Sequence, residues 1–104
     1  MDQNFIIVHV SEKLKLIRVE RGYTQEMMSS ILGISKKTLV QIEKKRARAN
    51  WTTVIAICAL FNDSDVLHSV FGRDVFQLIK TIAHHQLEQP EKKDLNRESI
   101  VGKY

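Results

Sequence analysis

The sequence predicts an all-α fold, and three observations support this prediction. Apolar residues recur at the i, i+3, i+4 spacing of a buried helical face along most of the chain. Gly22, Gly33 and Gly72 follow such segments, and glycine commonly ends helices. Residues that cap helix N-termini stand just before several of the segments. A chain of 104 residues has the length of one domain with a modest core.

The first helix is expected to begin at Ser11. This residue would be the N-cap, Glu12 would lie in the first turn, and Gly22 would end the helix. Residues 1–10 are rich in β-branched and aromatic side chains, and they could form an extended arm, a short strand or an extra turn of the helix. Their β propensity favours an extended N-terminal arm.

Two short helices joined by a tight turn are predicted next. Thr24 caps the first, Gly33 ends it, and Ser35 caps the second only two residues later. The apolar positions expected to face the core are Met28, Ile31, Leu32, Leu39 and Ile42. The outward positions of the second helix are Lys36, Lys37, Val40, Gln41, Lys44 and Lys45.

Positive charge is concentrated in and just after this second helix. The net charge of the chain is only +4. The bases between positions 36 and 48 are Lys36, Lys37, Lys44, Lys45, Arg46 and Arg48, and they are opposed only by Glu43. Such a run alone would be read as a solvated basic face. Its position on the second helix of a helix-turn-helix favours a polyanionic partner, namely double-stranded DNA.

The same stretch resembles the DNA-binding domain of the Cro and phage-repressor (XRE-like) family over roughly residues 12 to 61. The resemblance rests on Leu14-Lys15, Ile17-Arg18, Gly22-Tyr23-Thr24-Gln25-Glu26, Leu32-Gly33-Ile34-Ser35 and Ile42-Glu43. It implies a five-helix lambda-repressor-like fold and an ion pair between Arg18 and Glu43. The chain departs from the family pattern at Met28, Ser29 and Lys45, the last of which replaces the usual glycine.

Specific binding needs base contacts, which select sequence, and phosphate contacts, which position the protein. The residues expected to contact bases are Lys36, Lys37, Val40 and Gln41, because lysine can donate to guanine, glutamine can pair with adenine and valine can meet a thymine methyl. The residues expected to contact phosphates are Gln25, Thr38, Lys44, Lys45, Arg46 and Arg48. Thr38 could instead bond back within its own helix.

The helix-turn-helix domain is predicted to span residues 11–72. Asn50 caps a fourth helix, 51–61, whose apolar residues on most sides make it the central core helix. A short fifth helix over 66–71 is closed by Gly72.

A further helix is predicted over 73–89, followed by a flexible tail over 90–104. The helix carries an apolar stripe of Val75, Leu78, Ile79 and Ile82. This stripe must pack against its own domain or against another subunit. The run 5–8 is a second candidate for pairing two copies. We favour the helical stripe as the interface of a homodimer.

Several classes of protein are excluded by composition. Cys58 is the only cysteine, so there is no intrachain disulfide, and its apolar surroundings indicate a core residue in a reducing compartment. No run approaches the roughly 18 apolar residues of a membrane helix, and no cleavable signal is evident. We expect a cytoplasmic protein that contacts no membrane. No motif indicates an enzyme, a cofactor, a metal site or a small-molecule ligand.

The leading hypothesis is a sequence-specific transcriptional regulator, a repressor that binds a palindromic operator as a dimer. One alternative is an antitoxin that binds a toxin and its own operator. Another is a protein-interaction module that has kept the fold and lost DNA binding.

Overall fold

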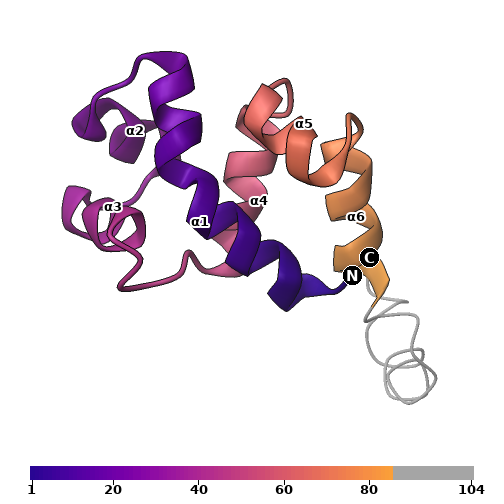
Figure 1. The fold of residues 1–104 in the computed structure, drawn as a ribbon. Helices are drawn as coiled ribbons and strands as arrows, with labels where there is room; N and C mark the ends of the chain where they lie inside the picture. The colour runs from indigo at the N-terminus through magenta and orange to yellow at the C-terminus, as the bar shows by residue number, and fades with distance from the viewer. Residues whose placement is uncertain (86–104) are drawn as a thin grey trace, which may run out of the picture.

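The computed structural model describes residues 1–85, which form six α-helices and no strand (Figure 1). The helices are α1 (Gln3–Arg21), α2 (Gln25–Leu32), α3 (Lys36–Glu43), α4 (Trp51–Leu60), α5 (Asp65–Phe71) and α6 (Val75–His85). The all-α prediction is therefore confirmed. Residues 86–89 of the predicted last helix, and the predicted tail 90–104, lie outside the described residues.

The predicted extended arm is wrong, because α1 already begins at Gln3. Asp2 is the N-cap, and its carboxylate accepts the Phe5 N–H at 2.9 Å. Ile6 and Val10 are fully buried in the core. Their burial on one helical face outweighs the weak β propensity of this segment.

Ser11 is consequently not an N-cap. It lies in the middle of α1, is buried, and accepts a hydrogen bond of 2.9 Å from the backbone N–H of Ala49. The bond ties α1 to the segment that enters α4.

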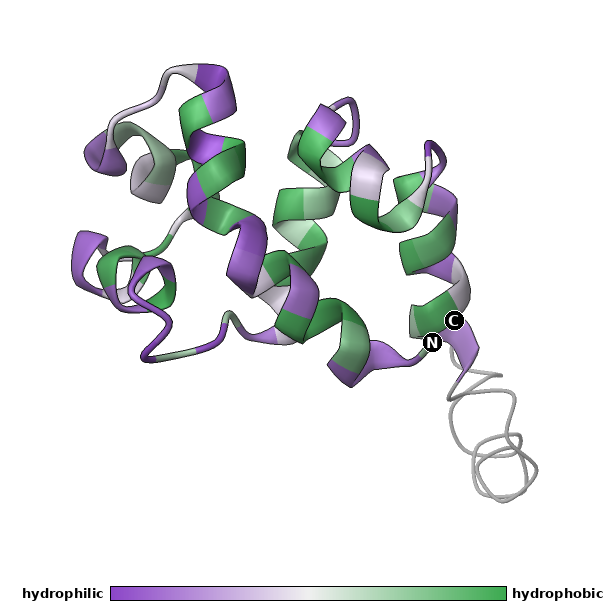
Figure 2. Ribbon diagram, viewed as in Figure 1, coloured by the Kyte–Doolittle hydropathy of each residue, from purple (hydrophilic) through white to green (hydrophobic). Residues whose placement is uncertain are grey.

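Helix α1 crosses the molecule, with α2 and α3 on one side of it and α4, α5 and α6 on the other (Figure 1). It packs against α3, α4 and α5. Helix α4 is hydrophobic over most of its length, whereas the loop after α3 is mostly hydrophilic (Figure 2). Within residues 1–85 no single helix combines the length and the apolar character of a membrane span. Helices α4 and α5 have both properties only when taken together, and the chain bends by 117° between them.

The apolar stripe of α6 mostly closes its own domain. Val75 and Ile79 are 1% and 4% exposed, and α6 packs on α4 and α5. Leu78 and Ile82 are half-buried against the same core. The assignment of Val75 and Ile79 to a dimer interface is therefore corrected: both side chains already have apolar partners within the chain.

Candidate nucleic-acid interface

Local capping forms the helix-turn-helix of α2 and α3. The Thr24 hydroxyl accepts the Met27 N–H at 3.1 Å, and the Ser35 hydroxyl accepts the Thr38 N–H at 3.0 Å. Gly33 ends α2 with a φ of 73°, a left-handed conformation that glycine adopts readily. The two predicted caps and the predicted stop are all present.

One apolar position in this motif was predicted wrongly. Ile31 is exposed, and Ser29 is buried in α2 alongside Met28 and Leu32. The Ser29 hydroxyl can be buried because it donates to the Glu26 carbonyl within the helix, at 3.0 Å.

Arg18 of α1 and Glu43 at the end of α3 form the predicted ion pair. Arg18 Nε donates to Glu43 Oε2 at 2.7 Å, and Arg18 Nη2 donates to Glu43 Oε1 at 3.0 Å. Arg18 Nη1 also donates to the Tyr23 carbonyl at 3.0 Å. The two side chains are 14% and 4% exposed, respectively, so the pair lies largely out of water.

A third helix joins this pair through Gln25. Its amide nitrogen donates to Glu43 Oε1 at 3.1 Å. Burial raises the pKa of Glu43, but the hydrogen bonds from Arg18 and Gln25, with the charges of Arg18 and Lys15, hold that pKa below its ordinary value. The carboxylate at the end of α3 is thus bound to α1 and to the start of α2.

The bond from Gln25 to Glu43 uses part of the hydrogen-bonding capacity that Gln25 was expected to offer to a phosphate. One amide hydrogen is engaged with Glu43, which leaves the second hydrogen for another acceptor. No local spacing indicated this bond, because the two residues are far apart in sequence. The first backbone N–H groups of α2 remain a second source of donors to a phosphate.

Helix α3 turns its polar face to solvent. Lys36, Lys37 and Thr38 are exposed, Val40 and Gln41 are half-buried, and Leu39 and Ile42 on the opposite face are buried. Lys36 Nζ lies 2.8 Å from Glu26 Oε2 in an exposed pair, whose attraction holds the pKa of Glu26 below its ordinary value. The Thr38 hydroxyl accepts from the Ser35 hydroxyl at 2.9 Å, so it takes part in the cap.

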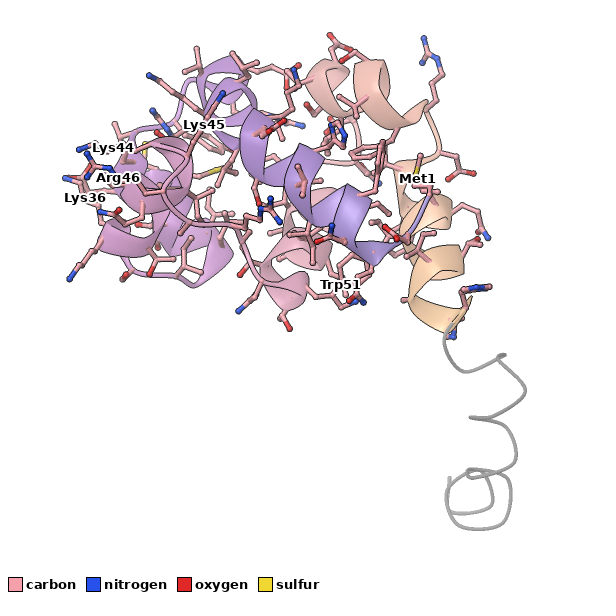
Figure 3. The ribbon with its side chains drawn as sticks, turned by 60° about the horizontal axis from the view of Figure 1, so that its bottom comes forward. Met1, Lys36, Lys44, Lys45, Arg46 and Trp51 are labelled. Atoms are coloured by element: carbon pink, nitrogen blue, oxygen red, sulfur yellow. The ribbon has the colours of Figure 1, made fainter. Side chains whose placement is uncertain are left out.

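The remaining cations follow directly on α3. Lys44, Lys45, Arg46 and Arg48 are all exposed. In Figure 3, Lys36, Lys44 and Arg46 lie at the same end of the molecule, whereas Met1 lies at the other end. The structure thus brings one lysine of α3 and two cations of its exit loop to the same end of the protein.

Lys45 adopts the conformation that glycine adopts at the ends of α1 and α2. Its φ is 62°, against 71° for Gly22 and 73° for Gly33. The Arg46 N–H donates to the Gln41 carbonyl at 2.9 Å, which closes the same hydrogen-bonded C-cap. Here a lysine occupies the left-handed position, at a conformational cost that glycine would avoid.

A helix-turn-helix whose second helix exposes lysines beside a half-buried glutamine defines a class of DNA-binding regulators. A family model described as "Helix-turn-helix domain" matches residues 11–66, more than half of the chain. The chain belongs to this helix-turn-helix family and is of the XRE-like type. No curated protein and no solved structure matches the chain.

Proposed function

We propose that this protein is a sequence-specific transcriptional regulator, a repressor that binds a palindromic operator in double-stranded DNA as a homodimer in the cytoplasm. The observation that carries the proposal is the attachment of α3. Its inner face is buried and its last residue, Glu43, is bound to Arg18 and Gln25, while its lysines face solvent. A rigidly held helix with a polar, cationic outer face suits the major groove.

Within this proposal, the first turns of α3 read bases. Lys37 is exposed and is not engaged in an ion pair within residues 1–85, so its ammonium group is available to guanine. Gln41 lies one turn later and suits an adenine. Before Lys36 contacts a base, its ion pair with Glu26 must break. This costs little, because an exposed pair contributes only about 0–1 kcal/mol.

The cations of the exit loop, with Gln25, would contact phosphates. Phosphate contacts fix the register of the protein on the duplex and carry no base information. Lys44, Lys45, Arg46 and Arg48 lie next to the end of α3, where they can reach the backbone that flanks the groove.

The homodimer requires a surface other than the buried positions of α6. Phe76 is 47% exposed at one edge of the buried stripe, so this edge of α6 can still pair with a second copy, whereas Leu78 and Ile82 are half-buried at the other edge. Two-fold symmetry would then place the two α3 helices about 34–36 Å apart, one turn of DNA.

Salt dependence and sequence selection test the proposal together. If four to six cations of each helix-turn-helix domain contact phosphates, the logarithm of the DNA-binding constant should fall with the logarithm of the salt concentration. The slope should be roughly −4 to −5 for each domain. A random-library selection should return a two-fold symmetric sequence. A slope near zero would contradict DNA binding, and enrichment without symmetry would contradict the dimeric operator.

One further observation favours a second candidate, the antitoxin. Leu16 and Val19 are exposed on α1 and are spaced by three residues, so they lie side by side on its surface. Such a pair can contact a protein partner. If a toxin binds there, Leu16→Glu should abolish protection from that toxin while DNA affinity is kept; equal loss of both would reject this surface.

A further inference from the structure

A pocket of about 230 Å³ lies between α1 and the loop that follows α3. It is lined by Val8, Ser11, Glu12, Ile42, Lys45, Arg46, Ala47 and Arg48. The sequence did not indicate it, because residues more than 30 positions apart meet there only after α1 has packed on α3. The loop is held at both ends: Arg46 donates to Gln41, and Ala49 donates to Ser11.

Hydrogen-bond donors without protein acceptors line this pocket. Ser11 is only 5% exposed, and its oxygen accepts from Ala49 N–H. Among residues 1–85, its own O–H has no protein acceptor. The backbone N–H groups of Ala47 and Arg48, two exposed residues of the lining, have no protein acceptor in this part of the chain either. A buried hydroxyl and unbonded backbone amides from the lining of one pocket can bind an oxygen acceptor.

The charge of the lining selects the kind of acceptor. Lys45, Arg46 and Arg48 contribute cations, and Glu12 contributes a single opposing carboxylate. No ion pair engages any of these four side chains within residues 1–85. The excess of positive charge favours a negatively charged ligand. Val8 and Ile42 add apolar surface, so an anion with a small apolar body is matched better than a bare ion.

We propose that this pocket binds a small organic carboxylate and that its occupation weakens DNA binding. The carboxylate accepts from Ser11 and the loop amides, and its apolar body contacts Val8 and Ile42. Its charge offsets the cations of the exit loop, which are the proposed phosphate contacts. The regulatory half of this inference rests on the proposed function; the binding half does not.

The binding half is tested on the free full-length chain with sodium benzoate as the probe and benzamide as its neutral counterpart. Amide resonances are followed during titration at constant ionic strength. We expect benzoate to shift the Ser11, Ala47, Arg48 and Ala49 resonances to saturation, and benzamide to bind about tenfold more weakly. Equal effects of the two compounds, or shifts elsewhere in the chain, would overturn the proposal.

Variants that remove one charge test whether the charge of the pocket lining determines benzoate affinity. Arg48→Gln should weaken benzoate binding about threefold, whereas Arg73→Gln, at a likewise exposed position outside the pocket, should leave it unaltered. Glu12→Gln should tighten benzoate about twofold, because it removes the opposing charge. The opposite sign for Glu12→Gln, or equal losses for the two arginine variants, would contradict an electrostatic pocket.

The regulatory half is tested by DNA affinity with and without saturating benzoate, each at the same ionic strength. We expect benzoate to raise the dissociation constant for duplex DNA about fivefold or more, and Glu12→Gln to respond at lower benzoate concentration. Unchanged DNA affinity with a filled pocket would overturn the regulatory role. If the protein binds no DNA even without benzoate, the proposed function fails instead, and the resonance titration still decides the binding half.

Discussion

Arg18 and Glu43 are joined by two hydrogen bonds, 2.7 and 3.0 Å long, across the contact between α1 and α3. Arg18→Ala would leave the Glu43 carboxylate buried without its cationic partner. Loss of one partner of a buried pair typically costs about 3–5 kcal/mol. We therefore expect a loss of about 3 kcal/mol or more in the free energy of unfolding, measured by urea titration.

Arg21→Ala is the control for this change. Arg21 pairs with Asp63, a largely exposed partner, and lies 5.3 Å from the Phe61 ring centre. A pair with so exposed a partner contributes about 1 kcal/mol or less, and a cation–π contact from a partly exposed arginine contributes about 1 kcal/mol. Equal losses for Arg18→Ala and Arg21→Ala would mean that the pair with Glu43 contributes no more than a surface contact.

The lowered pKa of Glu43 predicts a loss of stability in acid. A carboxyl group whose pKa is lower in the folded than in the unfolded chain stabilises the fold above its ordinary pKa of about 4.3. That contribution is lost as pH falls through the folded value. Glu20 adds to the effect, because the Ser64 hydroxyl lowers its pKa through a hydrogen bond of 2.6 Å.

Glu43→Gln isolates the Glu43 contribution. The variant should be less stable at pH 7, because Arg18 loses its charged partner, and its stability should fall less between pH 5 and pH 3. Glu26→Gln is the control, since Glu26 sits in an exposed pair with Lys36. Urea unfolding at several pH values provides the comparison. If Glu43→Gln loses as much stability in acid as the parent chain, carboxylates other than Glu43 cause the acid sensitivity.

The left-handed backbone of Lys45 predicts a stabilising substitution. A non-glycine residue in this region costs about 1–2 kcal/mol of folding free energy. Glycine removes that cost, but it also raises the entropy of the unfolded chain, which offsets part of the gain. Lys45→Gly should therefore stabilise the fold by about 0.5–1 kcal/mol.

Lys44→Gly is the matched control, because Lys44 has a φ of −83° and the change removes the same charge one position away. It should destabilise the fold by about 0.5–1 kcal/mol. Both variants should weaken DNA binding, since each removes a proposed phosphate contact. A stability change of the same sign in both would refute the argument from backbone strain.

Base and phosphate contacts should separate in binding measurements. Lys37→Ala and Gln41→Ala should each lose about 1–3 kcal/mol of discrimination between operator and random duplex. Lys44→Ala should weaken binding to both duplexes alike. If Lys44→Ala alters the preference and Lys37→Ala does not, the proposed roles are reversed.

Buried and exposed positions of α6 should respond differently to charge. Ile79→Asp places a carboxylate in the core and should unfold the domain. Phe76→Asp alters an exposed residue and should leave the fold intact while it weakens self-association in sedimentation. A folded Phe76→Asp variant that dimerises like the parent chain would move the pairing surface away from this edge of α6.

Local signals allowed much of the fold to be predicted from sequence. Thr24, Ser35, Gly22 and Gly33 act on backbone groups within a few residues, so their types alone mark where helices begin and end. The pair of Arg18 and Glu43 came from the family resemblance, since the two residues are 25 positions apart.

The start of α1 and the bonds of Ser11 and Gln25 were missed for different reasons. Ile6 and Val10 continue the spacing of Leu14, so the helical stripe was visible, but propensity was given more weight. The partners of Ser11 and Gln25 are 38 and 18 positions away, and no local spacing predicts contacts of that range.

The packing of α1 on α5 has a consequence for synthesis of the chain. Helix α1 is synthesised before α5, one of its partners, which is complete only at Phe71. At about 5–20 residues per second, the apolar face of α1 waits several seconds for that partner. During this interval the part of α1 that will contact α5 stays uncovered on the nascent chain, where a chaperone can bind it.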